Sequence, residues 1–294
     1  MIDEPLLVLS LKPSSTGQDV VNASSGSAAK IHTALHALRT NSPECLQDQF
    51  FSITLHSEIP QHCGFGSGTQ LSLAVAQAVQ ELNQSETLTT VELARRVERG
   101  ARSALGIYGF AAGGFMVETG KQKSAEISPL AVRADFPEDW KILLVTPQDQ
   151  AGISGVIEAD AIQQLGPMPI SLTEKLCRLA LMQLTPAVLE SNFREFAGGL
   201  TEFGHVVGEY FQPAQGGILA HPRMRDLEQL LISQGVQGIA QTSWGPTLSI
   251  VCPGDDEAAV VSSLIREAGY GEYCSLRIVN PLNRGAHSER RESD

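Results

Sequence analysis

The feature that most constrains the fold is residues 59–79, IPQHCGFGSGTQLSLAVAQAV, where a polar glycine-rich loop runs directly into an apolar helical segment. Gly64, Gly66 and Gly68 permit backbone conformations and close approaches that a Cβ atom would prevent. The segment that follows, about 69–83, carries apolar side chains on nearly every face, which predicts a buried helix. Unpaired N–H groups at the start of such a helix favour a bound anion, and a low-dielectric setting strengthens the hydrogen bonds to it.

The glycine pattern by itself leaves two interpretations open. One is a phosphate-binding loop, and the other is a turn from a strand to a helix that binds nothing. No lysine follows Gly68, so the stretch is not a Walker loop, and it does not make a convincing dinucleotide-binding fingerprint. The wider sequence is needed to choose between the two.

The overall charge limits the class of partner. A formal net charge of −12 and a pI near 5.0 argue against a nucleic-acid surface, which needs clustered lysine and arginine. A phosphorylated substrate would need local hydrogen-bond donors and a divalent cation to overcome this negative background.

The composition, 42% hydrophobic and 18% charged, is typical of a soluble globular protein. No apolar run approaches the roughly 18 residues of a membrane span. The first residues, MIDEPLLVLS, have no basic region ahead of an apolar core, so we expect no signal peptide. The five cysteines are dispersed without a C-x-x-C pair, which indicates reduced thiols and a cytoplasmic protein.

The first part of the chain is predicted to mix strands and helices. We expect strands over residues 5–11, 50–60 and 114–119, and helices over 27–40, 69–83 and 88–101. Thr90 is the expected N-cap of the last of these helices, with Glu92 in its first turn. Residues 106–120 carry too many glycines for a helix.

The pattern changes after Pro137, so we place two domains at 1–137 and 138–280. The second part is predicted to contain a strand over 140–147, helices over 155–165, 172–184 and 191–210, paired strands over 236–243 and 246–252, a helix over 255–269 and a strand over 272–279. This order outlines an α+β sandwich of the ferredoxin type. Residues 281–294 are charged and poor in apolar side chains, which predicts a disordered tail.

Three stretches together resemble one family. IPQHCGFGSGTQLSLAVA is similar to the phosphate loop of the GHMP kinase superfamily, in which a proline and a short spacer precede G-L-G-S-S/G and a buried helix. ERGARSALGIYGFAAGGFMVETG and GIAQTSWGPTLSIV are similar to the R-G-x-R-S-x-I-G and G-Q-S-S-W-G-P segments of its β-ribofuranosylaminobenzene 5′-phosphate synthase branch. The resemblance runs from about residue 1 to about residue 280.

The resemblance implies an α+β fold with a ribosomal protein S5 domain 2-like N-terminal domain and a ferredoxin-like C-terminal domain. It also implies a reaction in which phosphoribosyl pyrophosphate and 4-aminobenzoate condense with loss of pyrophosphate and carbon dioxide. This is a step toward the methanopterin cofactors of one-carbon metabolism. Mg²⁺ as cofactor and a homodimer are further implications of the family.

The residues that follow the second helix favour this reaction over phosphoryl transfer from ATP. Kinases of the superfamily read about P-S-G-x-D there, and the aspartate assists the phosphoryl acceptor. Residues 102–107 of this chain, RSALGI, contain no carboxylate. A ribosyl transfer needs none, because loss of carbon dioxide supplies the electron pair for the new bond. A small-molecule kinase and a non-catalytic phosphate-binding module remain the alternatives.

On this reading the glycine loop holds the phosphate groups through Gly64, Gly66, Ser67, Gly68, Thr69 and Gln70, with His62 beside them. Arg102 and Ser103 are the candidate catalytic residues, and a salt bridge at a helix end is the alternative role for them. Ser67 and Glu98 are candidate Mg²⁺ ligands, although a solvated carboxylate is the simpler reading of Glu98.

A strand end of the second domain is expected to face the loop and close the site. Gln241, Thr242 and Ser243 lie on it, and Trp244 either stacks on the aromatic ring of the acceptor or belongs to the core. His32 and His36 have the spacing of a metal pair but no third ligand, so we read them as ordinary histidines.

The chain departs from the family pattern in two places. Family members usually open with a strand pair before a stretch that corresponds to MIDEP, and this sequence begins at MIDEP. We therefore expect the strand pair to be missing and a sheet edge to be exposed, through either a misplaced start codon or a genuinely shorter protein. Phe65 stands where the family usually has leucine.

Overall fold

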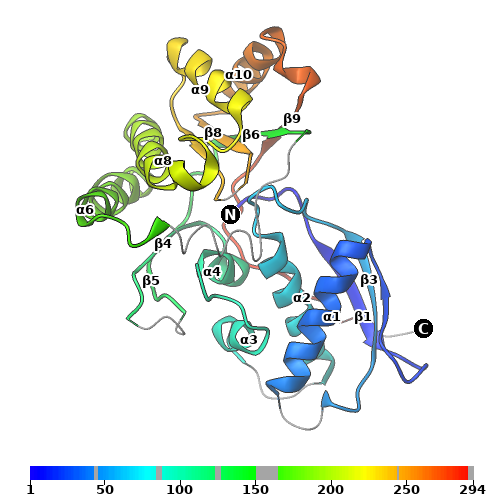
Figure 1. Cartoon of the computed structure of the whole chain (residues 1–294). Coiled ribbons are helices and arrows are strands. Elements are labelled where there is room, and N and C mark those ends of the chain that lie inside the picture. The colour runs from blue at the N-terminus through cyan, green and yellow to red at the C-terminus, as the bar shows by residue number, and fades with distance from the viewer. Residues whose placement is uncertain (43–45, 84–87, 123–126, 150–164, 244, 291–294) are drawn as a thin grey trace.

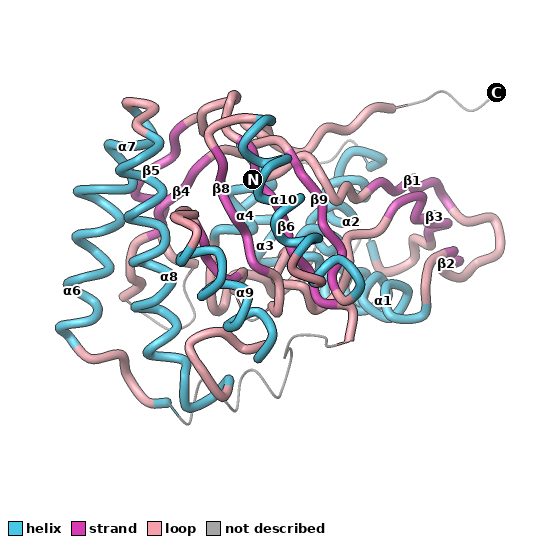
Figure 2. The backbone as a smooth tube through the Cα atoms, turned by 90° about the horizontal axis from the view of Figure 1, so that it is seen from above, coloured by secondary structure: helices cyan, strands magenta, loops and turns pink. Residues whose placement is uncertain are grey.

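The structure is a computed structural model that describes residues 1–42, 46–83, 88–122, 127–149, 165–243 and 245–290. It has an N-terminal half and a C-terminal half, and the first residue lies at the junction between them (Figure 1). Helices α6 and α8 lie side by side at the end of the molecule opposite the β1–β3 sheet (Figure 1, Figure 2). Within the described residues, no helix is both long and apolar enough to cross a membrane.

The N-terminal half contains β1 (Val8–Pro13), β2 (Val20–Asn22), α1 (Ser25–Thr40), β3 (Phe51–Ser57), α2 (Ser67–Asn83), α3 (Thr90–Arg96), α4 (Leu105–Ala112), β4 (Phe115–Glu118) and β5 (Leu130–Ala134). Strand β3 lies between β1, which is antiparallel to it, and β2, which is parallel. Period-2 alternation turns Phe51 and Ile53 toward α1 and α2, where both are buried. Polar His56 stays exposed.

Helix α2 is buried along its middle, as its sequence predicts. Leu71, Leu73, Val75 and Val79 are each at most 3% exposed and belong to the core of the N-terminal half. The helix begins at Ser67, two residues before the predicted start. This burial fixes the position of its N-terminal end, which is where the glycine loop joins it.

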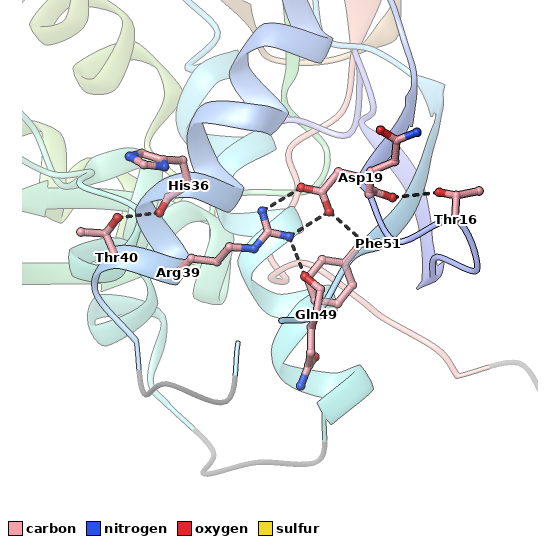
Figure 3. Close-up of polar contacts among 8 residues, drawn as sticks. Thr16, Asp19, His36, Arg39, Thr40, Gln49 and Phe51 are labelled. Carbon is pink, nitrogen blue, oxygen red and sulfur yellow. Dashed lines mark hydrogen bonds and ion pairs between the residues drawn. The ribbon is translucent and has the colours of Figure 1, made fainter. Parts of the chain in front are cut away.

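An ion pair ties the approach to β2 against α1 and β3 (Figure 3). Arg39, in the last turn of α1, donates two hydrogen bonds to the Asp19 carboxylate at 2.7 and 2.8 Å. The backbone N–H of Phe51 donates a third bond to that carboxylate at 3.0 Å. Three separate segments therefore meet at one partly buried acid group.

Some predicted elements are wrong. Residues 105–112 form α4 despite their glycines, because Gly106 and Gly109 let the helix pack closely against Thr69 and Met1. Thr89, not Thr90, caps α3 in a reciprocal pair with Glu92. Strands β2 and β5 and helix α9 were not anticipated, and the helix expected over 155–165 lies almost wholly outside the described residues.

The C-terminal half contains β6 (Lys141–Pro147), α6 (Ile170–Leu179), the π-helix η2 (Ala180–Leu184), α7 (Thr185–Leu189), α8 (Phe193–Gln215), α9 (Pro222–Ser233), β7 (Ile239–Gln241), β8 (Leu248–Cys252), α10 (Asp255–Glu267), the 3₁₀-helix η3 (Tyr270–Glu272) and β9 (Cys274–Val279). Its antiparallel sheet has the order β7-β8-β6-β9. Helices α9 and α10 share one core with the sheet, so the ferredoxin-like prediction is confirmed.

An apolar cluster joins the two halves near residue 137. Phe136 packs edge-on against Trp140 and Phe196, with ring centroids 5.2 and 5.3 Å apart respectively. Phe115 of β4 contacts the same Phe196, and Phe65 of the glycine loop packs against this cluster. The loop is therefore anchored in a core that both halves build.

The prediction of a disordered tail from residue 281 is wrong as far as residue 288. Asn283 forms two hydrogen bonds with the backbone of Phe136, and the N–H of Ala286 donates to the carbonyl of Phe110. Ser288 contacts Gln77 and Glu81 of α2. A polar tail can bind in this way because its side chains pair with main-chain groups instead of burying apolar surface.

Candidate active site

The glycine loop, residues 61–68, forms a turn in which alternate residues have left-handed backbone angles. His62 has φ 60°, Gly64 has φ 80° and Gly66 has φ 68°. Helix α2 begins where the N–H groups of Thr69 and Gln70 both donate to the carbonyl of Gly66. In the described part of the chain, no backbone N–H from 64 to 68 donates a hydrogen bond. These five groups are thus available to an anion.

Gly64 is required by the contact between the loop and the C-terminal half. A Cβ atom built on it would overlap the Oγ1 of Thr242 and lie 3.1 Å from the carbonyl oxygen of Ser243. Gly245 packs equally closely against the backbone of Cys63. The loop and the segment after β7 therefore touch through backbone, as predicted for the strand end that closes the site.

Thr242 makes the polar contact of this closure. Its hydroxyl is 2.9 Å from the carbonyl of Cys63 and 3.2 Å from the carbonyl of Thr247. Gln241 turns the other way, accepting a hydrogen bond from Ala220 N–H at 2.6 Å. Ser243 is exposed beside the loop, and Trp244 lies outside the described residues. Among residues 241–243, which the structure describes, Thr242 makes the direct hydrogen bond to the loop.

Two cations flank the start of α2. The Nη atoms of Arg99 lie 3.9 Å from a Cβ built on Gly68, and its Nε donates to the Oγ of Ser72 at 3.1 Å. Lys30 of α1 donates to the Oε1 of Gln61 at 2.8 Å. Burial lowers the pKa of both groups, and the charge of Arg99 lowers that of Lys30 further. Neither has a carboxylate partner among the described residues.

Lys30 and Ser67 line the same small hollow beside the loop, which Ser27, Glu58 and Gln61 also border. Glu58 is directed at the start of α1, where it accepts hydrogen bonds from Ser24 N–H and from the hydroxyls of Ser24 and Ser27. Those bonds hold the pKa of Glu58 below its ordinary value. The acid is thus engaged by α1, while Lys30 and the start of α2 share the hollow.

Helix α4 starts beside α2. Gln70 donates to the carbonyl of Gly106 at 2.8 Å, which binds the two helix starts together. The Oγ of Ser103 accepts from Leu105 N–H at 3.3 Å just before α4, while the neighbouring Arg102 is exposed. Both candidate catalytic residues therefore lie just before α4, whose start is bound to the start of α2, and the Ser103 hydroxyl already accepts a bond from Leu105 N–H.

A carboxylate does reach the start of α4, but from another element. Glu118 of β4 accepts a hydrogen bond from the N–H of Ala104 at 2.5 Å. The segment 102–107 itself carries no acid, so sequence spacing could not reveal this pair. Because this negatively charged carboxylate already lies at the start of α4, an anion is better received by the start of α2.

The two candidate Mg²⁺ ligands are placed differently. Ser67 begins α2 and lines the hollow. Glu98 is exposed and contacts Asn41 at the C-terminal end of α1, whereas Lys30 and the hollow lie near the other end of that helix. No group of three His, Cys, Asp or Glu side chains suited to a metal occurs in the described ranges. Mg²⁺ commonly binds through substrate phosphates with few protein ligands, and the Ser67 hydroxyl fits that mode.

The remaining loop residues have structural explanations. His62 is exposed on the turn, and burial raises the pKa of the Cys63 thiol, which keeps this thiol protonated at neutral pH. Sequence reasoning missed Lys30, Arg99 and Glu118. Arg99 opens the R-G-x-R-S segment and could have been noticed there, whereas the other two are brought to the site only by folding.

Comparison with known proteins identifies the family of this chain. The family models named GHMP kinases N terminal domain and GHMP kinases C terminal match residues 25–114 and 184–271. A β-ribofuranosylphenol 5′-phosphate synthase of Methanothermobacter thermautotrophicus is 31% identical over 97% of this chain and 88% of its own length. The protein of that name from Archaeoglobus fulgidus is 32% identical over 81% of this chain and 76% of its own.

The chain belongs to the β-ribofuranosylphenol 5′-phosphate synthase family. Members of this family are enzymes of the GHMP superfamily, so the family and enzyme class implied by the sequence are confirmed. A solved homoserine kinase from Cytophaga hutchinsonii shares the fold, with a TM-score of 0.64 at 14% identity over 97% of this chain and 88% of that one. The synthase family thus uses the GHMP fold, with its glycine loop between the two halves.

Proposed function

We propose that this enzyme joins the ribosyl group of phosphoribosyl pyrophosphate to a 4-substituted benzoate, with release of pyrophosphate and carbon dioxide. The observation that carries the proposal is the glycine loop. It offers the backbone N–H groups of residues 64–68 beside two cations, in a chain whose segment 102–107 has no acid to activate a phosphoryl acceptor.

The proposed reaction is balanced without a proton donor or acceptor. The bond from the anomeric carbon to pyrophosphate breaks, and its electron pair leaves with the pyrophosphate. The ring carbon that carries the carboxylate then bonds to the electron-poor anomeric carbon. Finally the bond to the carboxylate breaks, carbon dioxide leaves, and its electron pair restores the aromatic ring.

The residues of the site fit the first of these events. Donors aimed at a departing group lower the barrier because they stabilise charge that develops in the transition state. The loop N–H groups and the hydroxyls of Ser67 and Thr69 supply such donors at the start of α2. Bound Mg²⁺ would neutralise charge on the pyrophosphate, and Ser67 is the protein ligand we assign to it.

The acceptor is the point on which two expectations differ. The relatives are named for a ribofuranosylphenol product, whereas the resemblance in the sequence implies 4-aminobenzoate and an aminobenzene product. Loss of the carboxylate from 4-hydroxybenzoate leaves a phenol, so this compound fits the printed names. Both benzoates can stabilise the ring through a para substituent, and they should be assayed side by side.

Release of pyrophosphate tests the proposal. We expect release that requires phosphoribosyl pyrophosphate, Mg²⁺ and one of the two benzoates together. Hydrolysis of ATP that depends on a small alcohol, with no pyrophosphate release from the benzoate mixtures, would contradict it.

Glu118 is the one observation that favours a kinase, because it brings a carboxylate to the start of α4. A Glu118→Gln variant separates the two functions. The glutamine can still accept the bond from Ala104, so synthase turnover should stay within a few-fold of wild type. A kinase that uses this carboxylate as its base would lose about 10²–10⁴-fold.

A further inference from the structure

We propose that Lys30 and Arg99 bind the departing pyrophosphate, one on each side of the start of α2. This inference rests on the proposed function and names residues for its leaving group. It is carried by the positions and partners of the two side chains, which come from α1 and from the segment after α3.

Both cations are paired with neutral groups. Lys30 Nζ contacts the amide oxygen of Gln61, and Arg99 Nε contacts the hydroxyl of Ser72. This is unusual in a chain with 33 acidic and 21 basic residues, where carboxylate partners are plentiful. Half-buried cations ordinarily pair with carboxylates, because burial without a partner is costly. An anionic ligand supplies the missing partner.

The neutral partners orient the two cations toward the loop. Gln61 is itself held by the hydroxyl of Ser27 at 3.1 Å, so a chain of hydrogen bonds fixes the Lys30 ammonium beside the hollow that Ser67 lines. Ser72 uses only the Nε of Arg99, and both Nη atoms remain beside Gly68. A guanidinium in this position can donate two parallel bonds to one phosphate.

Burial lowers the pKa of Lys30, and the positive charge of Arg99 lowers it further, so the two cations repel each other. The ligand-free site therefore carries a cost that a polyanion removes on binding. Pyrophosphate matches the pair better than a single phosphate does, because it places charge on two centres that can meet two cations.

Binding of pyrophosphate and of ribose 5-phosphate to the full chain, each with Mg²⁺, tests the assignment by calorimetry. Lys30→Gln and Arg99→Gln should each weaken pyrophosphate binding by about 10-fold to 100-fold, as loss of a hydrogen bond to a charged group predicts. Binding of ribose 5-phosphate should stay within about 2-fold of wild type. This ligand carries the 5-phosphate of the substrate but no pyrophosphate, so it does not need the two cations.

Matched controls are Lys12→Gln and Arg95→Gln, which remove the same charges from exposed positions. These should leave pyrophosphate binding unchanged. The thermal midpoint of the ligand-free Lys30→Gln and Arg99→Gln variants should rise or stay the same, because a repulsion is removed. If the pair had a purely structural role, the two glutamine variants would instead have a lower thermal midpoint. In that case Lys30→Arg and Arg99→Lys, which keep the charge, should restore the midpoint but need not restore pyrophosphate binding.

Wild-type affinity for pyrophosphate in either glutamine variant would overturn the inference, as would an equal loss of ribose 5-phosphate binding. The test is independent of turnover. Pyrophosphate binding that needs both cations, in a chain that does not consume phosphoribosyl pyrophosphate, would contradict the proposed function and leave only the pyrophosphate-binding role of Lys30 and Arg99 standing.

Discussion

The hydroxyl of Thr242 in the C-terminal half donates to the carbonyl of Cys63 in the glycine loop, across 2.9 Å. The contact links the strand end of one half to the glycine-rich turn of the other. Close packing of Gly64 and Gly245 surrounds it, so the loop takes its shape from both halves. The site is therefore expected to respond to changes on either side of the junction.

Replacing Thr242 by valine keeps the shape of the side chain but removes the donor. We expect the free energy of unfolding to fall by about 1 kcal/mol, the usual contribution of one hydrogen bond, and the KM for phosphoribosyl pyrophosphate to rise. Urea unfolding and steady-state kinetics measure the two effects. Thr242→Ser is the matched control and should resemble wild type. If the valine variant matched the serine variant in both measurements, the hydrogen bond would be unimportant.

Alanine at Gly64 and alanine at Gly66 should differ in their effects. Both positions have left-handed φ values, so each substitution carries a backbone cost of about 1 kcal/mol. At Gly64 the new methyl group also overlaps Thr242, while at Gly66 it meets open space. We therefore expect Gly64→Ala to lose more stability and more substrate affinity than Gly66→Ala. Equal losses in unfolding and binding experiments would argue against the close contact.

Asp19 should make stability depend on acid pH. Burial alone would raise its pKa, but the hydrogen bonds from Arg39 and from Phe51 N–H outweigh burial and hold the pKa below its ordinary value of 3.8. A carboxyl with a depressed folded-state pKa contributes stability above its unfolded-state pKa and loses it as pH falls through the folded-state value. Unfolding should therefore become easier below about pH 4.

The Asp19→Asn variant tests this origin. At neutral pH it should lose about 1.5–3 kcal/mol of unfolding free energy, the range for hydrogen bonds to a charged group. It should also show a weaker dependence on acid pH than wild type in denaturant titrations. Asp48→Asn, at an exposed position, is the control for the charge change. If Asp19→Asn kept the full acid dependence of wild type, that dependence would come from another group.

The tail should contribute to stability through Asn283. Its side chain accepts from Phe136 N–H at 2.8 Å and donates to Phe136 C=O at 2.9 Å. Loss of both bonds in Asn283→Ala should lower the free energy of unfolding by about 1–2 kcal/mol. His287→Ala, at an exposed tail position, should have no effect. If the two variants were equally stable, the tail would not be bound at Asn283.

The sequence predicted the parts of the fold that rest on local pattern. Helix α2 and the pairing of β7 with β8 follow from apolar periodicity and from the sequence of elements. Helix α4 was missed because glycine disfavours an isolated helix, whereas here Gly106 and Gly109 are needed for close packing. A preference of about 1 kcal/mol per glycine is readily overcome by tertiary contacts.

The site was predictable only where its residues are adjacent in the chain. The glycine loop and Thr242 could be identified from motifs. Lys30 is a single lysine in the second turn of α1, and only the packing of α1 beside α2 brings it to the hollow. Glu118 reaches α4 from β4 for the same reason. Neighbours in space that are distant in sequence leave no local pattern to read.

Carbon dioxide release tests the central claim most directly. The enzyme would be incubated with phosphoribosyl pyrophosphate, Mg²⁺ and 4-hydroxybenzoate or 4-aminobenzoate labelled in the carboxyl group. We predict labelled carbon dioxide and pyrophosphate in equal amounts, with neither formed when one substrate is omitted. Pyrophosphate without labelled carbon dioxide, or no release of either while ATP is consumed, would contradict the proposed decarboxylating ribosyl transfer.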